Sequence, residues 1–592
     1  MEKLLFEYPE ECITEHVPYT SSSSASFPDG SETSNSDGDS QLEIPDNIKR
    51  KRLPLPNLSE IDVVRHFTKL SRMNFGIDVG PYPLGSCTMK YNPKVNEDIA
   101  RLEAFADLHP YSPESCLQGT LQLIYELEEY LKTLTGMDYF SLQAAAGSQS
   151  ELIGVMITKA FYKEKKEGKM KRTKIIIPDS AHGTNPATAA MCKFETVSIP
   201  TDLRGNMNLE KFKQSLNSDI ALVMLTNPNT LGLFEEDVVQ ISELAHENGT
   251  LMYCDGANMN AFLGITRPKD QGFDMIHLNL HKTFSTPHGG GGPGAGVLGV
   301  KSFLADYLPI PRVRRRSLQQ QQPQQQPQQQ PQQQPQQQPQ QQPQPQPQPQ
   351  PQQQVHLSRP HRKNTSVEDN NYNNYNNNYY FLDFTKRKSI GKVRCFYGSF
   401  GMLVRAYTYI RAYGSNIRRV SENAVLNANY LQSLLKEVYE LPYDRRCAHE
   451  FVLSCRKFGQ KSALNIAKRL LDYGVHPPTI YFPLIVPEAL MIEPTETESK
   501  EALDLFASAL CSIAQELQDR PDIVKAAPHT TPVGRLDEVV AARKPNLRWT
   551  PSSDQSIRSD KYEAGGSITG SSSTTSSRSN HDHVANSRGN NI

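Results

Sequence analysis

Two short runs, LMYCDGAN at residues 251–258 and MIHLNLHKT at residues 275–283, indicate how this chain folds. Each run begins with apolar residues that favour strands and ends in polar residues. Asp255 is among the polar residues of the first run, and Lys282 is among those of the second. One connection of helix length separates them. Near-continuous apolar runs joined in this way are typical of neighbouring strands in a parallel sheet that is buried on both faces.

The same pattern recurs between residues 138 and 300. Further apolar runs are YFSL at 139–142, III at 175–177 and ALVML at 221–225, each followed by polar or glycine residues and then a helix-compatible stretch. The pattern predicts an α/β domain built on a mainly parallel sheet. Ligands of such sheets bind beyond the carboxyl ends of the strands, so the residues that follow each run are the candidates for chemistry.

The first run leads through QAAAGSQ, residues 143–149, into a helical pattern. A turn of small residues that opens a helix presents backbone N–H groups and the positive end of the helix dipole, which suits a phosphate. Gly147, Ser148 and Gln149 are therefore candidate phosphate contacts. Taken alone, the same residues fit an ordinary helix cap equally well.

Two further loops carry single candidates. DSAHGTNP at 179–186 follows the second run, and its His182 could stack on a planar ligand, although an isolated loop histidine is more often structural. TNPNT at 226–230 follows the third run, and its Asn227 could bind a ligand or simply form a turn. Neither loop decides the function by itself.

The combination of Asp255 with Lys282 is more specific. Their places at the ends of two successive strands predict that both face one crevice. An acidic group keeps a pyridinium nitrogen protonated and a lysine amine forms a Schiff base with an aldehyde, which are the two contributions that pyridoxal phosphate needs from a protein. An Asp–Lys surface pair remains the alternative, but the phosphate turn, His182 and the glycine run at 289–294 favour the cofactor site.

Charge and cysteine content exclude other classes. Lys plus Arg is 63 and Asp plus Glu is 64, so no basic excess points to nucleic acid or to an acidic membrane surface. The 9 cysteines lack metal-type spacing, and no apolar run approaches the roughly 18 residues of a membrane span. We expect no metal and a cytoplasmic location, or a mitochondrial one in a eukaryote, although no transit peptide is legible.

Long parts of the 592-residue chain are of low complexity. Every residue from Gln319 to Gln354 is Gln or Pro, residues 20–42 are rich in Ser, and residues 370–380 are rich in Asn and Tyr. Such segments contain too little apolar surface to offset the entropy of ordering, so they predict disorder. The Gln/Pro tract fits a tolerated loop expansion, a ligand for proline-binding modules or a self-association segment.

Together these motifs resemble the glycine cleavage system P-proteins, and more narrowly subunit 2 of the two-subunit glycine dehydrogenase (decarboxylating). The resemblance covers residues 53–311 and 381–548, and the inserts depart from it. Beyond the strand ends it rests on further motifs: YPLGSCTMKYNP at 82–93, HPY at 109–111, SIG at 389–391, FYG at 396–398, HPPT at 476–479 and EPTE at 493–496.

The resemblance implies fold type I of the pyridoxal phosphate enzymes, with a mostly parallel seven-stranded sheet in a large domain and a smaller C-terminal α/β domain. We therefore expect an N-terminal segment with a disordered Ser-rich insert at 1–52, and an arm with the large domain at 53–311. A disordered insert at 312–380, the small domain at 381–548 and a disordered tail at 549–592 would follow.

The resemblance also implies site roles. Lys282 would form the Schiff base with pyridoxal 5'-phosphate, Asp255 would pair with the pyridine nitrogen and His182 would lie against the ring. The turn of Gly147, Ser148 and Gln149 would hold the phosphate. Two asparagines, Asn227 and Asn258, would add contacts to the cofactor.

The implied reaction is that of an oxidoreductase: decarboxylation of glycine with transfer of the aminomethyl group to the lipoyl arm of H-protein. Subunit 1, in a tetramer with two of each subunit, and the T- and L-proteins would be partners; no nucleic acid or membrane would be. Two alternatives stay open: another fold type I enzyme, such as an aminotransferase or cysteine desulfurase, and a non-catalytic paralogue acting as a scaffold.

Overall fold

The computed structural model describes residues 45, 47–48, 58–165, 172–288, 294–317, 378–385 and 388–547. Two compact units are present, residues 1–535 and residues 536–592, and the second contains one described helix, α14 (Glu538–Arg543). The segments 20–42, 319–354, 370–377 and 549–592, for which the sequence predicts disorder, lie outside the described residues. No helix in the described part combines the length and hydropathy that a membrane crossing requires.

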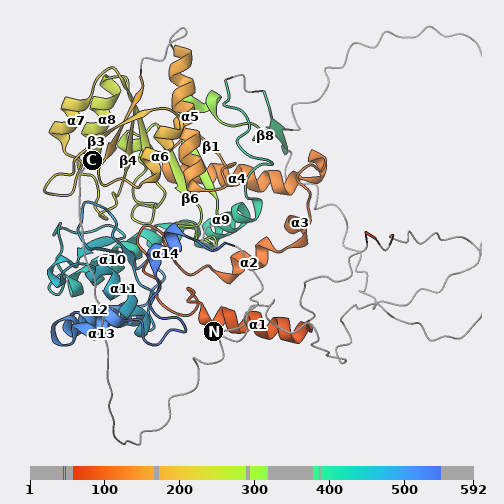
Figure 1. Ribbon diagram of the computed structural model, residues 1–592. Helices are drawn as coiled ribbons and strands as arrows, with labels where there is room; N and C mark the ends of the chain where they lie inside the picture. Colours follow the sequence, from red (N-terminus) through yellow and green to blue (C-terminus); the bar gives the residue numbers. More distant parts are fainter. Residues whose placement is uncertain are drawn as a thin grey trace, which may run out of the picture. The chain divides into compact units, whose positions relative to one another are not determined.

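The first unit is built on a seven-stranded sheet with the strand order β1-β7-β6-β5-β4-β2-β3 (Figure 1). β7 runs antiparallel to both of its neighbours, and the other neighbouring strands are parallel. All the predicted runs are strands, so the expected mostly parallel α/β sheet is confirmed. The strands are β1 (Tyr139–Ser141), β2 (Lys174–Pro178), β3 (Glu195–Ile199), β4 (Ile220–Thr226), β5 (Leu251–Asp255), β6 (Met275–Asn279) and β7 (Gly296–Val300).

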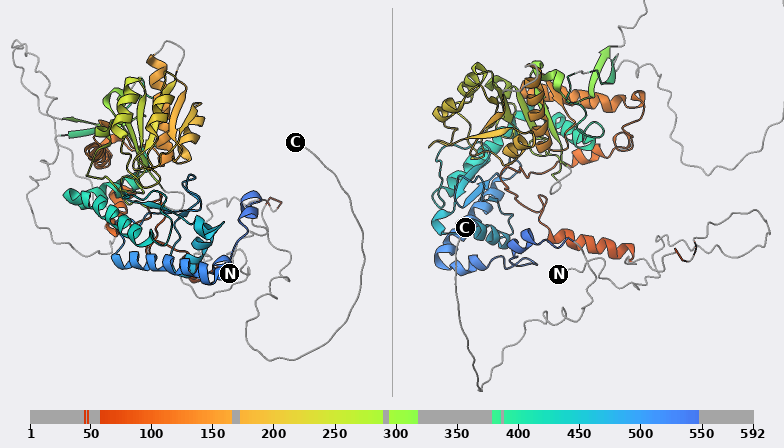
Figure 2. Two further views of the ribbon diagram at one scale, coloured as in Figure 1. Left: turned by 90° about the vertical axis from the view of Figure 1, so that its left-hand side faces the viewer. Right: turned by 45° about the horizontal axis from the view of Figure 1, so that its top comes forward.

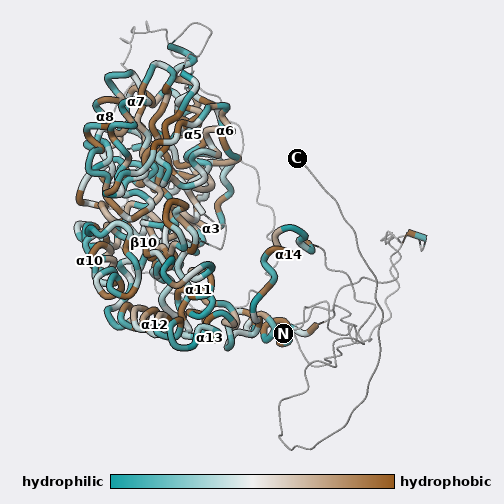
Figure 3. The backbone as a smooth tube through the Cα atoms, turned by 60° about the vertical axis from the view of Figure 1, so that its left-hand side comes forward, coloured by the Kyte–Doolittle hydropathy of each residue, from teal (hydrophilic) through white to brown (hydrophobic). Residues whose placement is uncertain are grey.

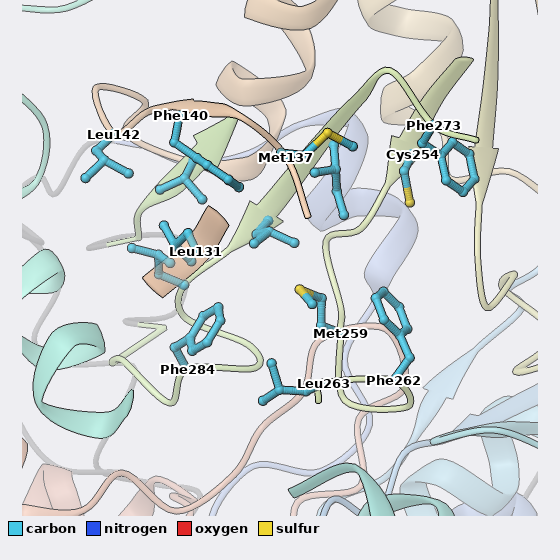
Figure 4. Packing of buried hydrophobic residues seen from close by; sticks show 14 of the residues in the cluster. Leu131, Met137, Phe140, Leu142, Cys254, Met259, Phe262, Leu263, Phe273 and Phe284 are labelled. Carbon is cyan, nitrogen blue, oxygen red and sulfur yellow. The ribbon is translucent and has the colours of Figure 1, made fainter. Parts of the chain in front are cut away.

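Helices cover both faces of this sheet (Figure 2). One hydrophobic core joins alternate strand residues such as Val223 and Ile276 to helices α4 (Gln118–Thr135), α7 (Leu209–Ser215), α8 (Val238–Glu247) and α9 (Phe400–Tyr413). The other core joins the intervening strand residues to α5 (Gly147–Lys165) and α6 (Thr184–Met191). Side chains of a strand alternate between its faces, so a strand packed on both sides must be apolar throughout. Figure 4 shows Phe140, Cys254 and Phe273 in the first of these cores.

A second, smaller sheet follows in sequence. Its strands are β10 (Phe451–Ser454), β11 (Thr479–Ile480) and β12 (Ala489–Ile492), in the antiparallel order β10-β12-β11. Four helices pack with it around a core of their own: α10 (Arg418–Leu435), α11 (Ser462–Asp472), α12 (Lys500–Asp519) and α13 (Pro521–Ala526). Figure 3 shows hydrophobic segments gathered between α8 and α5, whereas hydrophobic and hydrophilic stretches alternate along α10, α12 and α13.

The structure draws the boundaries around the large insert differently from the prediction. Its ends are strands, because β8 (Arg312–Ser317) pairs antiparallel with β9 (Asn378–Asp383). Val313 and Tyr380 are buried in the core of the first sheet, which gives these strands a packing partner. Helix α9 belongs to that core as well, so the residues after 381 first complete the hydrophobic core of the large sheet, and the second sheet follows them.

The segment before α4 connects the two sheets. It contains α1 (Glu60–Met73), α2 (Lys94–Ala100) and α3 (Glu103–Ala106), and between α1 and α2 it passes along β12. Leu84 forms an isolated bridge with Ile492, and the Gly85 N–H donates to the Met491 carbonyl over 3.3 Å. A Cβ on Gly85 would lie 2.6 Å from that carbonyl oxygen, so only glycine permits this approach. The contact brings Ser86 and Thr88 toward the strand ends.

Candidate active site

The carboxyl ends of the parallel strands open into a cavity of about 610 Å³, part of which is solvent. Three regions contribute its walls: the loops after β1, β2, β4, β5 and β6, the residues just before β10, and the segment before α2. The lining residues are Ser86, Gly147, Ser148, Glu151, His182, Thr184, Thr226, Pro228, Thr230, Asp255, Ala257, Asn258, His277, Asn279, Lys282, His449 and Glu450.

Lys282 lies in this cavity, three residues after the end of β6. Its side chain is half-buried, and among the described residues its amine has no hydrogen bond or ion pair. The following loop is held firmly, because the buried amine of Lys90 donates to the Thr283 carbonyl over 2.7 Å and pairs with Glu496 at 2.6 Å. The fold thus presents an amine that no ion pair within the described part of the chain occupies.

Asp255, the last residue of β5, lines the same cavity and is 5% exposed. Its carboxylate accepts from Asn185 Nδ2 over 3.2 Å and from the Ala257 N–H over 3.1 Å. His277 Nε2 lies 3.4 Å from Asp255 Oδ1, and the other ring nitrogen of His277 is 2.8 Å from the Tyr253 hydroxyl. This chain of contacts fixes the carboxylate in one orientation.

A second buried carboxyl group, that of Glu151, lies beside Asp255. Burial, followed by the negative charge of Asp255, raises the pKa of Glu151 to about 9. Two carboxylates so close in a dry interior do not both ionise. Glu151 therefore holds the proton, and Asp255 is free to carry the negative charge.

The first turn of α5 forms another wall. Ser148 and Gly147 line the cavity, and a Cβ on Gly147 would lie 1.8 Å from Asn279 Oδ1, so the close packing requires glycine. The free N–H groups and dipole of this 19-residue helix suit an anion. Gln149 is not among the lining residues, because its amide accepts from the Ala145 N–H and donates to the Val393 carbonyl.

His182 lines the cavity at the end of the loop after β2. Its Nδ1 accepts from the Thr184 N–H over 3.2 Å and lies 2.8 Å from the Thr184 hydroxyl, so these contacts orient the ring. Burial lowers the pKa of His182, which favours the neutral imidazole. A neutral ring is suited to lie against a planar ligand.

The two asparagines predicted to contact the cofactor lie in different places, one in the cavity lining and the other outside it. Asn258 lines the cavity, donating to Glu493 over 2.7 Å and to the Thr88 hydroxyl over 2.5 Å. Asn227 is buried behind it, donating to Gln271 and accepting from the Glu235 N–H. It is not among the lining residues, and it stabilises the turn after β4.

Sequence reasoning missed several lining residues. His277 interrupts the apolar run of β6, and a polar residue inside a buried strand was a usable signal. His449 and Glu450 precede β10, where the Ser86 N–H donates to Glu450 over 2.7 Å across 364 positions of sequence. No local sequence pattern predicts a contact between residues so far apart in the chain.

The lining fits a polar ligand. Asn279 Oδ1, Thr226 Oγ1 and both ring nitrogens of His449 are buried and lack a hydrogen-bond partner in the described part of the chain. No arginine is among the described lining residues. Arg394 donates to Ser399, and Arg405 pairs with Glu97 at 2.7 Å. The described lining therefore lacks the guanidinium that would mark a site for a second substrate carboxylate.

Comparisons with known proteins give the family of this chain. The family model for the glycine cleavage system P-protein matches residues 35–312, and the model for the glycine dehydrogenase C-terminal domain matches residues 420–529. The probable glycine dehydrogenase (decarboxylating) subunit 2 of Caldanaerobacter subterraneus subsp. tengcongensis is 51% identical over 506 residues, which is 85% of this chain and 92% of the relative. The probable subunit 2 of Thermotoga maritima is 48% identical over 514 residues, or 86% and 95% of the two chains.

Among solved structures, an inhibitor-bound glycine decarboxylase (P-protein) of the glycine cleavage system is similar, with a TM-score of 0.58. The match has 18% sequence identity and covers 79% of this chain and 93% of that one, so it shows the shared fold. The family itself is shown by the relatives, which match nearly over their whole length. This chain belongs to the glycine cleavage system P-protein family, and both relatives named above are probable glycine dehydrogenase (decarboxylating) subunits 2.

Proposed function

We propose that this chain is the pyridoxal phosphate-bearing subunit of a glycine dehydrogenase (decarboxylating). It would remove CO₂ from glycine and pass the aminomethyl group to the lipoyl arm of an H-protein. The observation that carries the proposal is the presence of Lys282, with its unpaired amine among the described residues, and of Asp255 in one cavity. Membership in the P-protein family supports the reaction and the substrate.

The lining residues suggest how the cofactor would be held. Lys282 would bond to its aldehyde carbon, Asp255 would meet its ring nitrogen and His182 would lie against its ring. Gly147 and Ser148, in the first turn of α5, would receive its phosphate. Bound there, pyridoxal phosphate supplies an electron sink for the pair left when the carboxyl group departs.

The chain's own residues would keep that sink effective. Because Glu151 holds a proton, the charge of Asp255 remains available to a protonated ring nitrogen. His277 and Tyr253 support Asp255 from behind, so the carboxylate need not reorient during the reaction. The absence of an arginine from the described lining favours a substrate with a single carboxyl group, and this argues against an aminotransferase of dicarboxylic substrates.

Membership in the family supports a proposal for the partners. The matched relatives are named as subunit 2, which supports a separate subunit 1, and we propose a tetramer with two of each. A lipoylated H-protein would accept the aminomethyl group, with T- and L-proteins completing the system. The oxidoreductase name would then describe reduction of the lipoyl disulfide.

The test is glycine-dependent exchange of labelled bicarbonate into the carboxyl group of glycine, with lipoylated H-protein and subunit 1 present. We expect exchange by the unaltered chain and none above background by Lys282→Ala. Lys94→Ala is the matched control, because Lys94 forms an exposed ion pair with Asp78 at 3.0 Å and does not line the cavity. Undiminished exchange by Lys282→Ala, or no exchange by the unaltered chain, would refute the proposal.

A further inference from the structure

Three ionisable side chains gather where the second sheet meets the cavity. They are His449, Glu450 and Glu493, which are 2%, 3% and 0% exposed. One ring nitrogen of His449 and one carboxyl oxygen from each glutamate all lie within 4.8 Å of one another. Two buried carboxyl groups at this separation share one proton, as Glu151 and Asp255 do elsewhere in the cavity.

Hydrogen bonding decides which of the two glutamates is ionised. Glu493 accepts from the Thr88 N–H and hydroxyl, from Asn258 and from Asn260, at distances of 2.7–3.2 Å. Donors that converge on a carboxylate stabilise its charged form. Glu450 accepts from the Ser86 N–H over 2.7 Å, so it has fewer donors and is the one that keeps the proton.

The titration of Glu450 agrees with this assignment. Burial, followed by the charge of Glu493, raises the pKa of Glu450 to about 8. The charged and titratable groups around Glu450 are Glu493, His449, Lys282, Cys87 and Cys447. Near neutral pH, Glu450 is therefore a carboxylic acid.

Glu450 also faces the reacting space. Glu450 and His449 line the cavity together with Lys282, whereas Glu493 is not among the lining residues. His449 Nε2 lies 3.8 Å from Glu450 Oε1 and has no hydrogen-bond partner among the described residues. Behind Glu450, Ser86 and Thr88 adopt φ values of 60° and 49°, a backbone region that a threonine rarely occupies. Strained residues of this kind persist where surrounding bonds hold a site in place.

We propose that Glu450 is a catalytic acid, which protonates the sulfur atom released when the lipoyl disulfide is opened. The inference rests on the proposed function and assigns a residue to its second step. The aminomethyl carbon bonds to one sulfur, the S–S bond breaks, and the other sulfur leaves with the electron pair and takes the proton of Glu450. The bond between the methylene and carboxyl carbons of glycine breaks to supply the electron pair. The disulfide gains two electrons, one from the carboxyl carbon as it becomes CO₂ and one from the methylene carbon as it exchanges its bond to carbon for a bond to sulfur. Water returns one proton to Glu450, which balances the proton consumed overall.

Glu493 has a different role from Glu450. It does not line the cavity, and its charge keeps the proton on Glu450, so it is a positioning residue. Glu493→Gln removes the charge that opposes ionisation of Glu450. The pKa of Glu450 should fall in this variant, and the pH dependence of exchange should move with it.

The first test observes the proton directly, in the holoenzyme without glycine or H-protein. The infrared spectrum of the unaltered enzyme minus that of Glu450→Gln should show a carboxylic acid carbonyl band that titrates with a pKa of about 8, while the band of Glu151, with a pKa of about 9, is common to both and cancels. Glu235→Gln is the matched control, because Glu235 is a buried glutamate outside the cavity lining, and burial raises its pKa to about 7. A difference spectrum without this band would overturn the inference.

The second test uses bicarbonate exchange with saturating H-protein. Glu450→Gln should lower kcat by about 10²-fold, with the KM for glycine little changed, and should lose the decline in kcat on the alkaline side of the pH profile. Glu450→Asp retains an acid and should retain that decline at a reduced rate. Unchanged kcat in Glu450→Gln overturns the inference alone, whereas no exchange by the unaltered enzyme defeats the proposed function.

Discussion

Gly154 offers a sharp test of how the sheet supports the cavity. It lies within α5, and a Cβ at this position would come 2.4 Å from Cε2 and 3.2 Å from Cδ2 of the Tyr253 ring. The ring is 0% exposed, and its hydroxyl is bonded to His277, which contacts Asp255. The ring therefore cannot turn away without disturbing the group that is proposed to hold the cofactor nitrogen.

The expected magnitude for Gly154→Ala comes from two opposing effects. Alanine favours a helix interior by about 1 kcal/mol over glycine. Overpacking a rigid core costs about 1–3 kcal/mol, and a contact of 2.4 Å with an enclosed ring places the cost toward the upper end. We expect a net loss of about 1–2 kcal/mol in the free energy of unfolding, with weaker pyridoxal phosphate binding.

Urea denaturation followed by circular dichroism, and titration of the apoprotein with pyridoxal phosphate, measure the two effects. Gly119→Ala in α4 is the matched control, because a Cβ there meets no atom within 4 Å. The control should lose no stability, because the added methyl group meets no neighbour, and it should bind the cofactor normally. If Gly154→Ala is as stable as Gly119→Ala and binds the cofactor equally well, the packing argument is wrong.

Three further predictions concern other parts of the chain. Glu128→Gln should lower the free energy of unfolding, measured by urea denaturation, by about 3 kcal/mol. The buried Arg312 lies 2.7 Å from Glu128 and would lose its counter-charge. An unchanged urea midpoint would contradict this. The folded-state pKa of Glu151, about 9, exceeds the ordinary value of 4.5, so its stabilising contribution is complete below that ordinary value and is lost as pH rises through about 9. The urea concentration at the unfolding midpoint of the apoprotein should therefore decrease as the pH is raised from about 6 to about 8. The decrease should be much smaller in Glu151→Gln, and parallel pH profiles of the two proteins would contradict this. Deletion of residues 319–354, which lie outside the described residues, should leave bicarbonate exchange nearly unchanged, and a large loss of turnover would refute that expectation.

The sheet was predictable from sequence because its signal is local. Strands buried on both faces must be apolar throughout, so β4 and β5 stand out as uninterrupted runs. Parallel strands also bring their carboxyl ends to one edge, which is why Asp255 and Lys282 could be placed in one cavity. The strands at the two ends of the large insert were harder to predict from sequence, because Val313 and Tyr380 gain their packing partner only in the folded core.

The site was predictable only in part. Gln149 and Asn227 have the polar side chains expected of ligand contacts, but backbone groups and Gln271 satisfy them. Glu151 and Glu450 were missed, because a buried glutamate acquires its chemistry from a neighbour that the fold supplies. For Glu450 that neighbour is Glu493, which the fold brings alongside from the end of β12.

The central claim is that the amine of Lys282 bonds covalently to pyridoxal phosphate. The direct measurement is borohydride reduction of the purified holoprotein, followed by proteolysis and mass spectrometry of the labelled peptide. The account predicts one stable phosphopyridoxyl modification, on Lys282, and its absence from Lys282→Ala. A protein that takes up no cofactor, or a modification carried by another lysine such as Lys90, would contradict the account.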